Sequence, residues 1–99
     1  MPDALLTLHC ARADAQALVE ALRDVVRVPI QQLEEVAHGH DYGDADTSEQ
    51  VAGALRRALL QMVLPEQQVA AAVEAARTSR RRLPFRWHSV AVIASGRFE

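Results

Sequence analysis

The pair of histidines at positions 38 and 40 is the strongest chemical signal in the chain. With their neighbours they read His38-Gly39-His40-Asp41. Imidazole nitrogen and carboxylate oxygen are ligands of first-row transition metals. Two histidines that are separated by a single glycine can bind the same ion when the loop folds back. The glycines and aspartates of residues 38–47 are typical of a loop. The segment therefore predicts a site for zinc, copper, nickel or cobalt, with a plain solvated loop as the alternative.

Two further histidines lie in apolar segments. His88 lies in a predicted strand near the end of the chain and is a candidate fourth ligand beside His38 and His40, in particular across subunits. His9 and Cys10 are neighbours on another predicted strand, so their side chains point to opposite faces and do not easily share an ion. We expect Cys10 to be a small buried side chain and His9 to be a satisfied core or edge histidine.

Arginine supplies all the basic side chains, since the 11 Lys+Arg residues include no lysine. Schiff-base chemistry and a phosphate-loop lysine are therefore excluded. Arg56, Arg57 and Arg97 are candidates for contact with an anion or effector. The run at residues 80–82 reads as the solvated end of a helix, with phosphate or an acidic partner as the alternative.

The sequence carries no recognisable catalytic machinery. A glycine-rich phosphate loop and a dinucleotide fingerprint are missing, and the single cysteine, Cys10, excludes both a disulfide and a Cys-x-x-Cys pair. No Ser/His/Asp set follows from the spacing. The formal net charge of −2 does not favour a nucleic-acid partner. We therefore do not expect an enzyme.

The hydrophobic pattern predicts six elements in the order β-α-β-β-α-β. A strand is expected in residues 30–36, with a helix as the rival because Glu and Gln are weak strand formers. The other elements are a strand at 4–10, a helix at 13–25, a strand at 55–64, a helix between Pro65 and Pro84 and a strand at 85–94. This order indicates an α+β, ferredoxin-like fold, in which two helices cover one face of a four-stranded antiparallel sheet.

The architecture bears on assembly and location. The 99 residues form one domain, 1–99, and the sheet face without helices needs a partner, which predicts a homo-oligomer. No apolar stretch approaches the roughly 18 residues of a membrane span, and the start of the chain lacks a signal-peptide pattern. We expect a cytoplasmic protein.

Two stretches carry a resemblance to a known family. They are Ser48-Glu49-Gln50-Val51-Ala52-Gly53 followed by Arg56-Arg57, and the ending from Trp87-His88 to Phe98. Together they resemble a small bacterial family of the PII-like (GlnB-like) superfamily, nearly end to end. This sequence has Ala54 where the family usually has an arginine, and it keeps half of an aromatic-Trp pair as Arg86-Trp87.

The resemblance implies a function class. Genes of the family often lie beside heavy-metal efflux pumps, and superfamily members form trimers whose loop between the second and third strands reaches ligands and partners. It implies a trimeric sensor or regulator linked to heavy-metal homeostasis, with a transporter or efflux component as a partner. His38, His40, Asp41 and His88 would hold the metal. The alternatives are a nucleotide-binding signalling protein that uses Arg56, Arg57 or Arg97, and a ligand-free adaptor.

Overall fold

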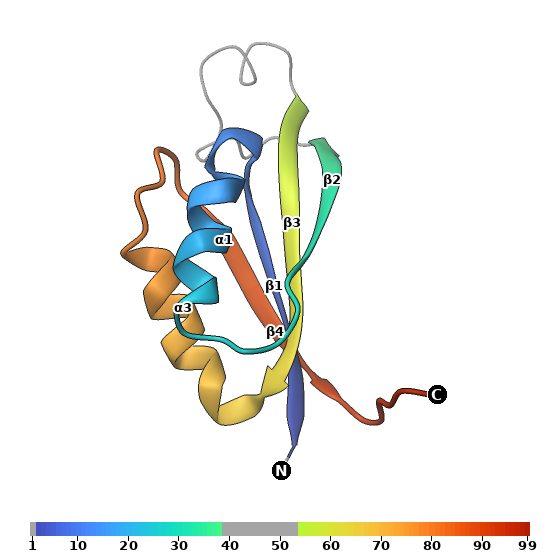
Figure 1. Cartoon of the computed structure of the whole chain (residues 1–99). Helices are drawn as coiled ribbons and strands as arrows, with labels where there is room; N and C mark the ends of the chain where they lie inside the picture. Colours follow the sequence, from blue (N-terminus) through green and yellow to red (C-terminus); the bar gives the residue numbers. More distant parts are fainter. Residues whose placement is uncertain (1, 39–53) are drawn as a thin grey trace.

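The computed structural model describes residues 2–38 and 54–99, of which residues 54 and 55 are described by their backbone alone. Within these two ranges, four strands and two α-helices follow one another in the predicted order (Figure 1). A short 3-10 helix precedes each α-helix. The elements are β1 (Asp3–Ala11), η1 (Arg12–Asp14), α1 (Ala15–Arg23), β2 (Gln31–His38), β3 (Ala54–Pro65), η2 (Glu66–Gln68), α3 (Val69–Arg77) and β4 (Arg86–Val92).

The four strands form one antiparallel sheet in the order β2-β3-β1-β4. The two strands that are distant in sequence, β1 and β3, lie at its centre, and β2 and β4 form its edges. This is the ferredoxin-like arrangement that the sequence predicts. Residues 31–38 form a strand because they pair with β3 from Gln31↔Gln61 to His38↔Ala54, so tertiary pairing overrides the weak strand propensity of Glu and Gln.

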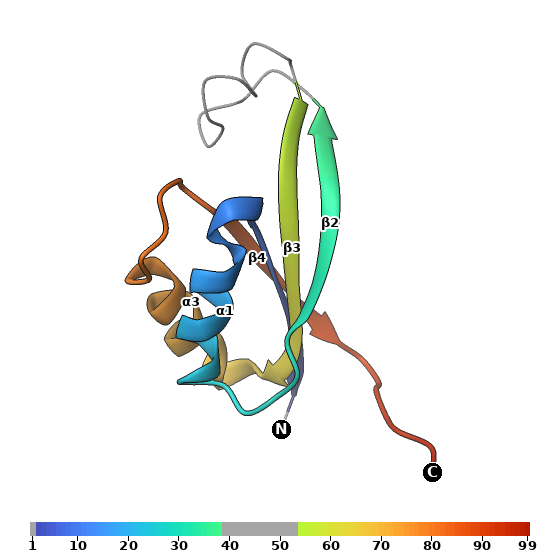
Figure 2. The same ribbon diagram turned by 45° about the horizontal axis from the view of Figure 1, so that its top comes forward.

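Both helices pack on the same face of the sheet (Figure 2). Leu18 and Leu22 of α1 meet Leu6 and Leu8 of β1, all with no exposed surface. In α3 the buried positions are alanines, and this lets the helix lie close to the rest of the core. The other members of the core are Cys10, Ala15, Val26, Ala58, Leu60, Met62, Leu64, Ala72 and Ala76.

The opposite face of the sheet carries no helix among the described residues (Figure 2). We call it the open face. Alternate residues of the strands lie on it: the cross-strand register joins Val63, Leu5 and Val90 in one row and Leu33, Leu59 and His9 in another. Leu33 and Val90 are about half exposed, with 48% and 51% of their surface accessible. The open face therefore carries apolar side chains that no helix of the described residues covers.

Some predicted boundaries need correction. His38 is the last residue of β2 and not the first residue of a loop, because it pairs with Ala54. α3 ends at Arg77, where the Thr78 and Ser79 hydroxyls donate to the last helical carbonyls, so residues 80–82 lie beyond the helix. The last strand ends at Val92. In the described ranges, neither helix has the length and apolar character that a membrane span requires.

Candidate functional site

The predicted loop site lies almost wholly outside the described residues. His40 and Asp41 belong to residues 39–53, so their positions as metal ligands stay a prediction. His38 is described, and it is an exposed residue at the end of edge strand β2. Only one of the three predicted loop ligands is thus placed.

Within one chain, His88 does not lie near His38. His88 lies opposite Thr7, in the cross-strand row that continues through Gln61 to Gln31 on β2. The step along β2 from residue 31 to residue 38 covers roughly 23 Å at about 3.3 Å per residue. The two histidines also belong to opposite edge strands. A metal ion shared by His38 and His88 therefore requires two subunits.

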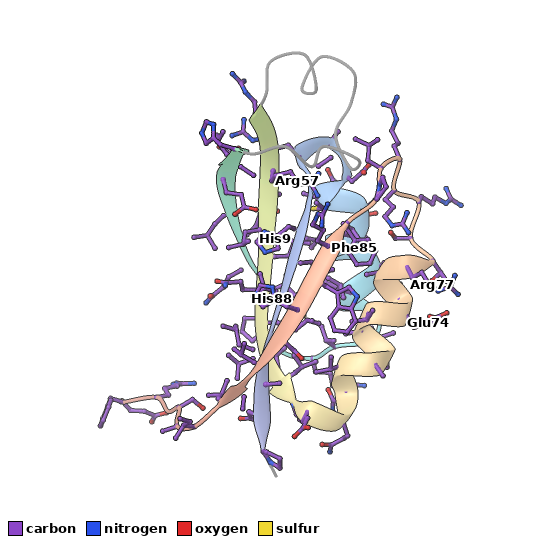
Figure 3. The ribbon with its side chains drawn as sticks, turned by 180° about the vertical axis from the view of Figure 1, so that it is seen from behind. His9, Arg57, Glu74, Arg77, Phe85 and His88 are labelled. Carbon is purple, nitrogen blue, oxygen red and sulfur yellow. The ribbon has the colours of Figure 1, made fainter. Side chains whose placement is uncertain are left out.

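His88 instead lies beside His9 on the open face (Figure 3). The two imidazole rings are stacked, with 5.6 Å between their centroids and 28° between their planes. On the other side of His9, its Nδ1 lies 2.5 Å from Oε1 of Glu35 on β2. Three strands thus contribute one polar cluster, which we call the His9 cluster: His9, Glu35 and His88.

Polar contacts continue around the His9 cluster. The Arg57 guanidinium donates a hydrogen bond from Nη2 to the backbone oxygen of His9 over 2.7 Å, and this arginine is almost fully buried. One row away, Gln61 Nε2 donates to Thr7 Oγ1 over 3.3 Å. The open face therefore has a hydrogen-bonded polar centre between apolar residues.

The three arginines predicted to hold an effector are not brought together. Arg56 is exposed on β3 and Arg57 is buried beside His9. Arg97 lies in the C-terminal segment, where it pairs with Glu99 over 3.2 Å. Arg57 lies opposite Ala11 and Val92 lies opposite Asp3, so roughly 26 Å of β1 separates their rows. Within one chain these arginines do not form a single anion site.

The segment after α3 contains contacts that sequence reasoning missed. The buried carboxylate of Asp14 accepts hydrogen bonds from the backbone N–H groups of Arg82 and Leu83, each over 2.9 Å. The Arg81 guanidinium carbon lies 5.0 Å from the centroid of the Phe85 ring. These contacts hold residues 81–85 against η1, so the arginine run is not simply a solvated helix end. The signal in the sequence was Asp14, which directly precedes the apolar stripe of the first helix. It could not identify the hydrogen-bond partners, because Arg82 and Leu83 are distant from Asp14 in sequence.

Cys10 is a buried core residue, as predicted. Burial raises the pKa of its thiol to about 11, and the nearby Arg57 cation offsets part of that rise. The thiol is therefore protonated at neutral pH and is a poor nucleophile and metal ligand. In the part of the chain that the structure describes, no group of three or more His, Cys, Asp or Glu side chains is arranged to hold a metal ion.

These features define the chain as a protein of ferredoxin-like fold, with a polar cluster on the open face of its sheet. The profile of a family described as "Protein of unknown function (DUF3240)" matches residues 1–99, so the chain belongs to this family. No curated protein sequence matches the chain significantly.

Solved structures share the fold at low sequence identity. A DUF3240 protein from Shewanella baltica has a TM-score of 0.74 and 14% identity, over 98% of this chain and 97% of that chain. CPII, a nitrogen regulatory PII-like protein from Thiomonas intermedia K12 solved with ADP, AMP and bicarbonate, has a TM-score of 0.62 and 12% identity, over 96% and 97%. The B. subtilis GlnK–ATP complex has a TM-score of 0.64 and 9% identity, over 90% and 82%. At these identities the comparisons establish the fold.

Proposed function

We propose that this chain is a homo-oligomeric regulatory protein of the PII-like kind, which binds a small effector and acts on a partner protein without catalysis. The observation that carries the proposal is the end-to-end match of its fold to PII-like proteins described as regulatory or signalling proteins. The polar cluster lies on the open face, so an effector bound there would lie where a second copy of the chain packs and would affect assembly. The link to heavy-metal efflux and a transporter partner remains a prediction from the family resemblance, as does the cytoplasmic location.

Two surfaces support a homo-oligomer. The open face leaves Leu33, Val63 and Val90 between 39% and 51% exposed on a sheet that two helices cover only on the other side. Beyond β4 the chain runs away from the sheet, with Ile93 and Phe98 fully exposed (Figure 1). Apolar surface of this kind gains stability when another copy covers it. That the homo-oligomer is a trimer is implied by the family resemblance and not by these surfaces.

A nucleotide is the effector that the comparisons favour. CPII was solved with ADP and AMP, and GlnK with ATP. For this chain, the exposed Arg56 and Arg97 suit contact with phosphate, whereas Arg57 is already buried against the His9 carbonyl. Because Arg56 and Arg97 lie apart within one chain, a nucleotide contacted by both would lie between subunits. A metal ion bound by His38, His40 and Asp41 is the second candidate effector, and an adaptor without a ligand is the third.

Native mass spectrometry of the full chain, alone and with ATP or ADP, tests the proposal directly. We expect an oligomer that takes up nucleotide and that unfolds at a higher temperature when nucleotide is present, since a ligand at 100 times its Kd adds about 2.7 kcal/mol of stability. A monomer would contradict the proposed assembly. An oligomer that ignores both nucleotides would contradict the nucleotide as effector and favour the metal or adaptor alternatives.

Two substitutions on β4 form a matched pair for the assembly. Val90→Asp places a charge on the open face, whereas Ser89→Asp places the same charge on the adjacent, exposed position of the other face. We expect Val90→Asp to dissociate the oligomer, since burial of an unpaired carboxylate is unfavourable. Ser89→Asp should leave the number of subunits in the oligomer unchanged. Equal effects of the two substitutions would place the interface elsewhere.

A further inference from the structure

We infer that His9 and His88 bind a transition-metal ion on the open face, with Glu35 as the residue that orients His9. His88 was predicted to complete the loop site, but it lies beside His9, and the site proposed here uses none of the loop residues 38–47. The inference rests on the proposed oligomer only for the groups that complete the coordination shell. The inference gives a role to His9, which the sequence alone indicated to be a satisfied core or edge histidine.

The tautomer of His9 follows from its partner. The carboxylate of Glu35 only accepts hydrogen bonds, so the His9 nitrogen 2.5 Å away, Nδ1, is the donor. The proton on Nδ1 leaves the lone pair of a neutral imidazole on Nε2. A carboxylate behind a histidine in this way is the usual outer partner of a metal-binding imidazole, because it sets the ring orientation and raises the basicity of the ligating nitrogen. His9 therefore has the support that a metal ligand needs.

His88 lies at a suitable distance for a second ligand. With metal–nitrogen bonds of about 2.0–2.1 Å, two imidazoles on one ion have ring centroids roughly 5 Å apart. The observed separation of 5.6 Å is close to this value. The rings are stacked, so joint coordination requires a turn of the His88 ring about its side-chain torsions. His88 is exposed, and the backbones of β1 and β4 can stay in place while its side chain rotates.

The ligand atoms select the class of metal. Mg²⁺ and Ca²⁺ are held by oxygen ligands, whereas His9 and His88 offer imidazole nitrogen. Arg57 contacts the His9 carbonyl and Arg86 lies directly opposite His9 on β4, so their positive charge opposes every cation and only strong nitrogen coordination offsets it. Zn²⁺, Cu²⁺ and Ni²⁺ bind neutral imidazole nitrogen strongly. Two imidazoles leave coordination positions open, which water or a second copy packed on the open face would fill.

Zn²⁺ affinity of the full chain, measured by competition with a chromophoric chelator, tests the inference. Ser89→Gln, at the exposed position next to His88 on β4, is the control for His9→Gln and His88→Gln. We expect each of the two open-face substitutions to weaken Zn²⁺ binding at least about tenfold, and the Ser89→Gln control to bind like the wild type. The double variant His38→Gln/His40→Gln measures any separate contribution of the loop histidines. Electron paramagnetic resonance of bound Cu²⁺ should show two nitrogen ligands in the wild type and in the Ser89→Gln control.

The outcomes separate this site from its rivals. No Zn²⁺ binding by the wild type, equal binding by all variants, or loss of binding in the His38→Gln/His40→Gln variant alone would each overturn the inference. If His9→Gln disturbs folding, the exposed His88→Gln still provides the comparison. An intact oligomer that responds to nucleotide but not to Zn²⁺ would overturn only the metal site. A chain that binds Zn²⁺ through His9 and His88 but remains a monomer would keep the metal site and overturn the proposed assembly.

Discussion

The carboxylate of Asp14 accepts a hydrogen bond from the backbone N–H of Leu83, with 2.9 Å between the two heavy atoms. The second carboxylate oxygen accepts from the N–H of Arg82 over the same distance. One buried side chain at the start of the first helical segment thus satisfies two backbone donors in the connection between α3 and β4. These two hydrogen bonds hold the connection between α3 and β4 against η1.

Asp14→Ala should therefore destabilise the fold. The substitution leaves two backbone donors without their acceptor, and we expect the free energy of unfolding to fall by about 2–4 kcal/mol. Urea denaturation followed by circular dichroism measures the loss. Asp24→Ala is the control, because Asp24 is exposed, and it should change stability by less than about 0.5 kcal/mol. Equal effects of the two substitutions would show that the Asp14 contacts do not stabilise the fold.

Stability at high pH should depend on Cys10. Its pKa is about 11 in the folded chain and 9.0 for an ordinary thiol. Between these values the unfolded chain releases the thiol proton and the folded chain retains it, so stability falls as pH rises from about 9 to 11. The fall reaches about 2–3 kcal/mol at the upper end. Urea titrations at several pH values should show it in the wild type and lack it in Cys10→Ala; parallel curves for the two proteins would contradict the assignment.

Arg57 and Arg56 are neighbours on β3 that should respond differently to substitution. Arg57 is almost fully buried and bonded to His9, so Arg57→Ala should lower the free energy of unfolding by about 2–5 kcal/mol. Arg56 is exposed, and Arg56→Ala should cost less than about 1 kcal/mol. Thermal denaturation of both variants checks this. Similar losses at the two positions would mean that burial of Arg57 is not what makes it important.

The C-terminal segment should contribute to self-association. Ile93 and Phe98 are fully exposed and lie beyond the sheet of their own chain. We expect Ile93→Ser/Phe98→Ser to weaken the oligomer at least about tenfold, since each lost apolar contact removes roughly 1.5–3 kcal/mol of burial. Sedimentation velocity across a concentration series measures the change. Ser95→Ala is the control, and an unchanged oligomer in the double variant would exclude the segment from the interface.

Local patterns were sufficient for the order of the elements. Leu6 and Leu8 lie on the buried face of β1, and Leu18 and Leu22 lie on the buried stripe of α1, because the periods of strand and helix place alternate or every third to fourth residue on one side. Pro65 marks the end of β3 as expected. The boundary at Arg77 was missed because hydroxyl groups of Thr78 and Ser79 end the helix before the arginine run.

The open-face cluster was not predictable in the same way. His9 was read as a satisfied core or edge residue, and His88 was paired with the loop histidines, since residue spacing does not give the register between strands. The register of β1 with β3 and β4, and of β2 with β3, brings Glu35, His9 and His88 together.

The sequence by itself determined the fold class, the buried Cys10 and the sheet face without a helix, because hydrophobic periodicity is a local property of each segment. The tertiary structure decided which polar side chains meet: Asp14 with Leu83, His9 with Glu35 and His88, and Arg57 with the His9 carbonyl. These contacts depend on strand register and on the packing of distant segments. They arise only when the chain closes into a sheet, where the pairing of β1 with both β3 and β4 sets the distances between side chains.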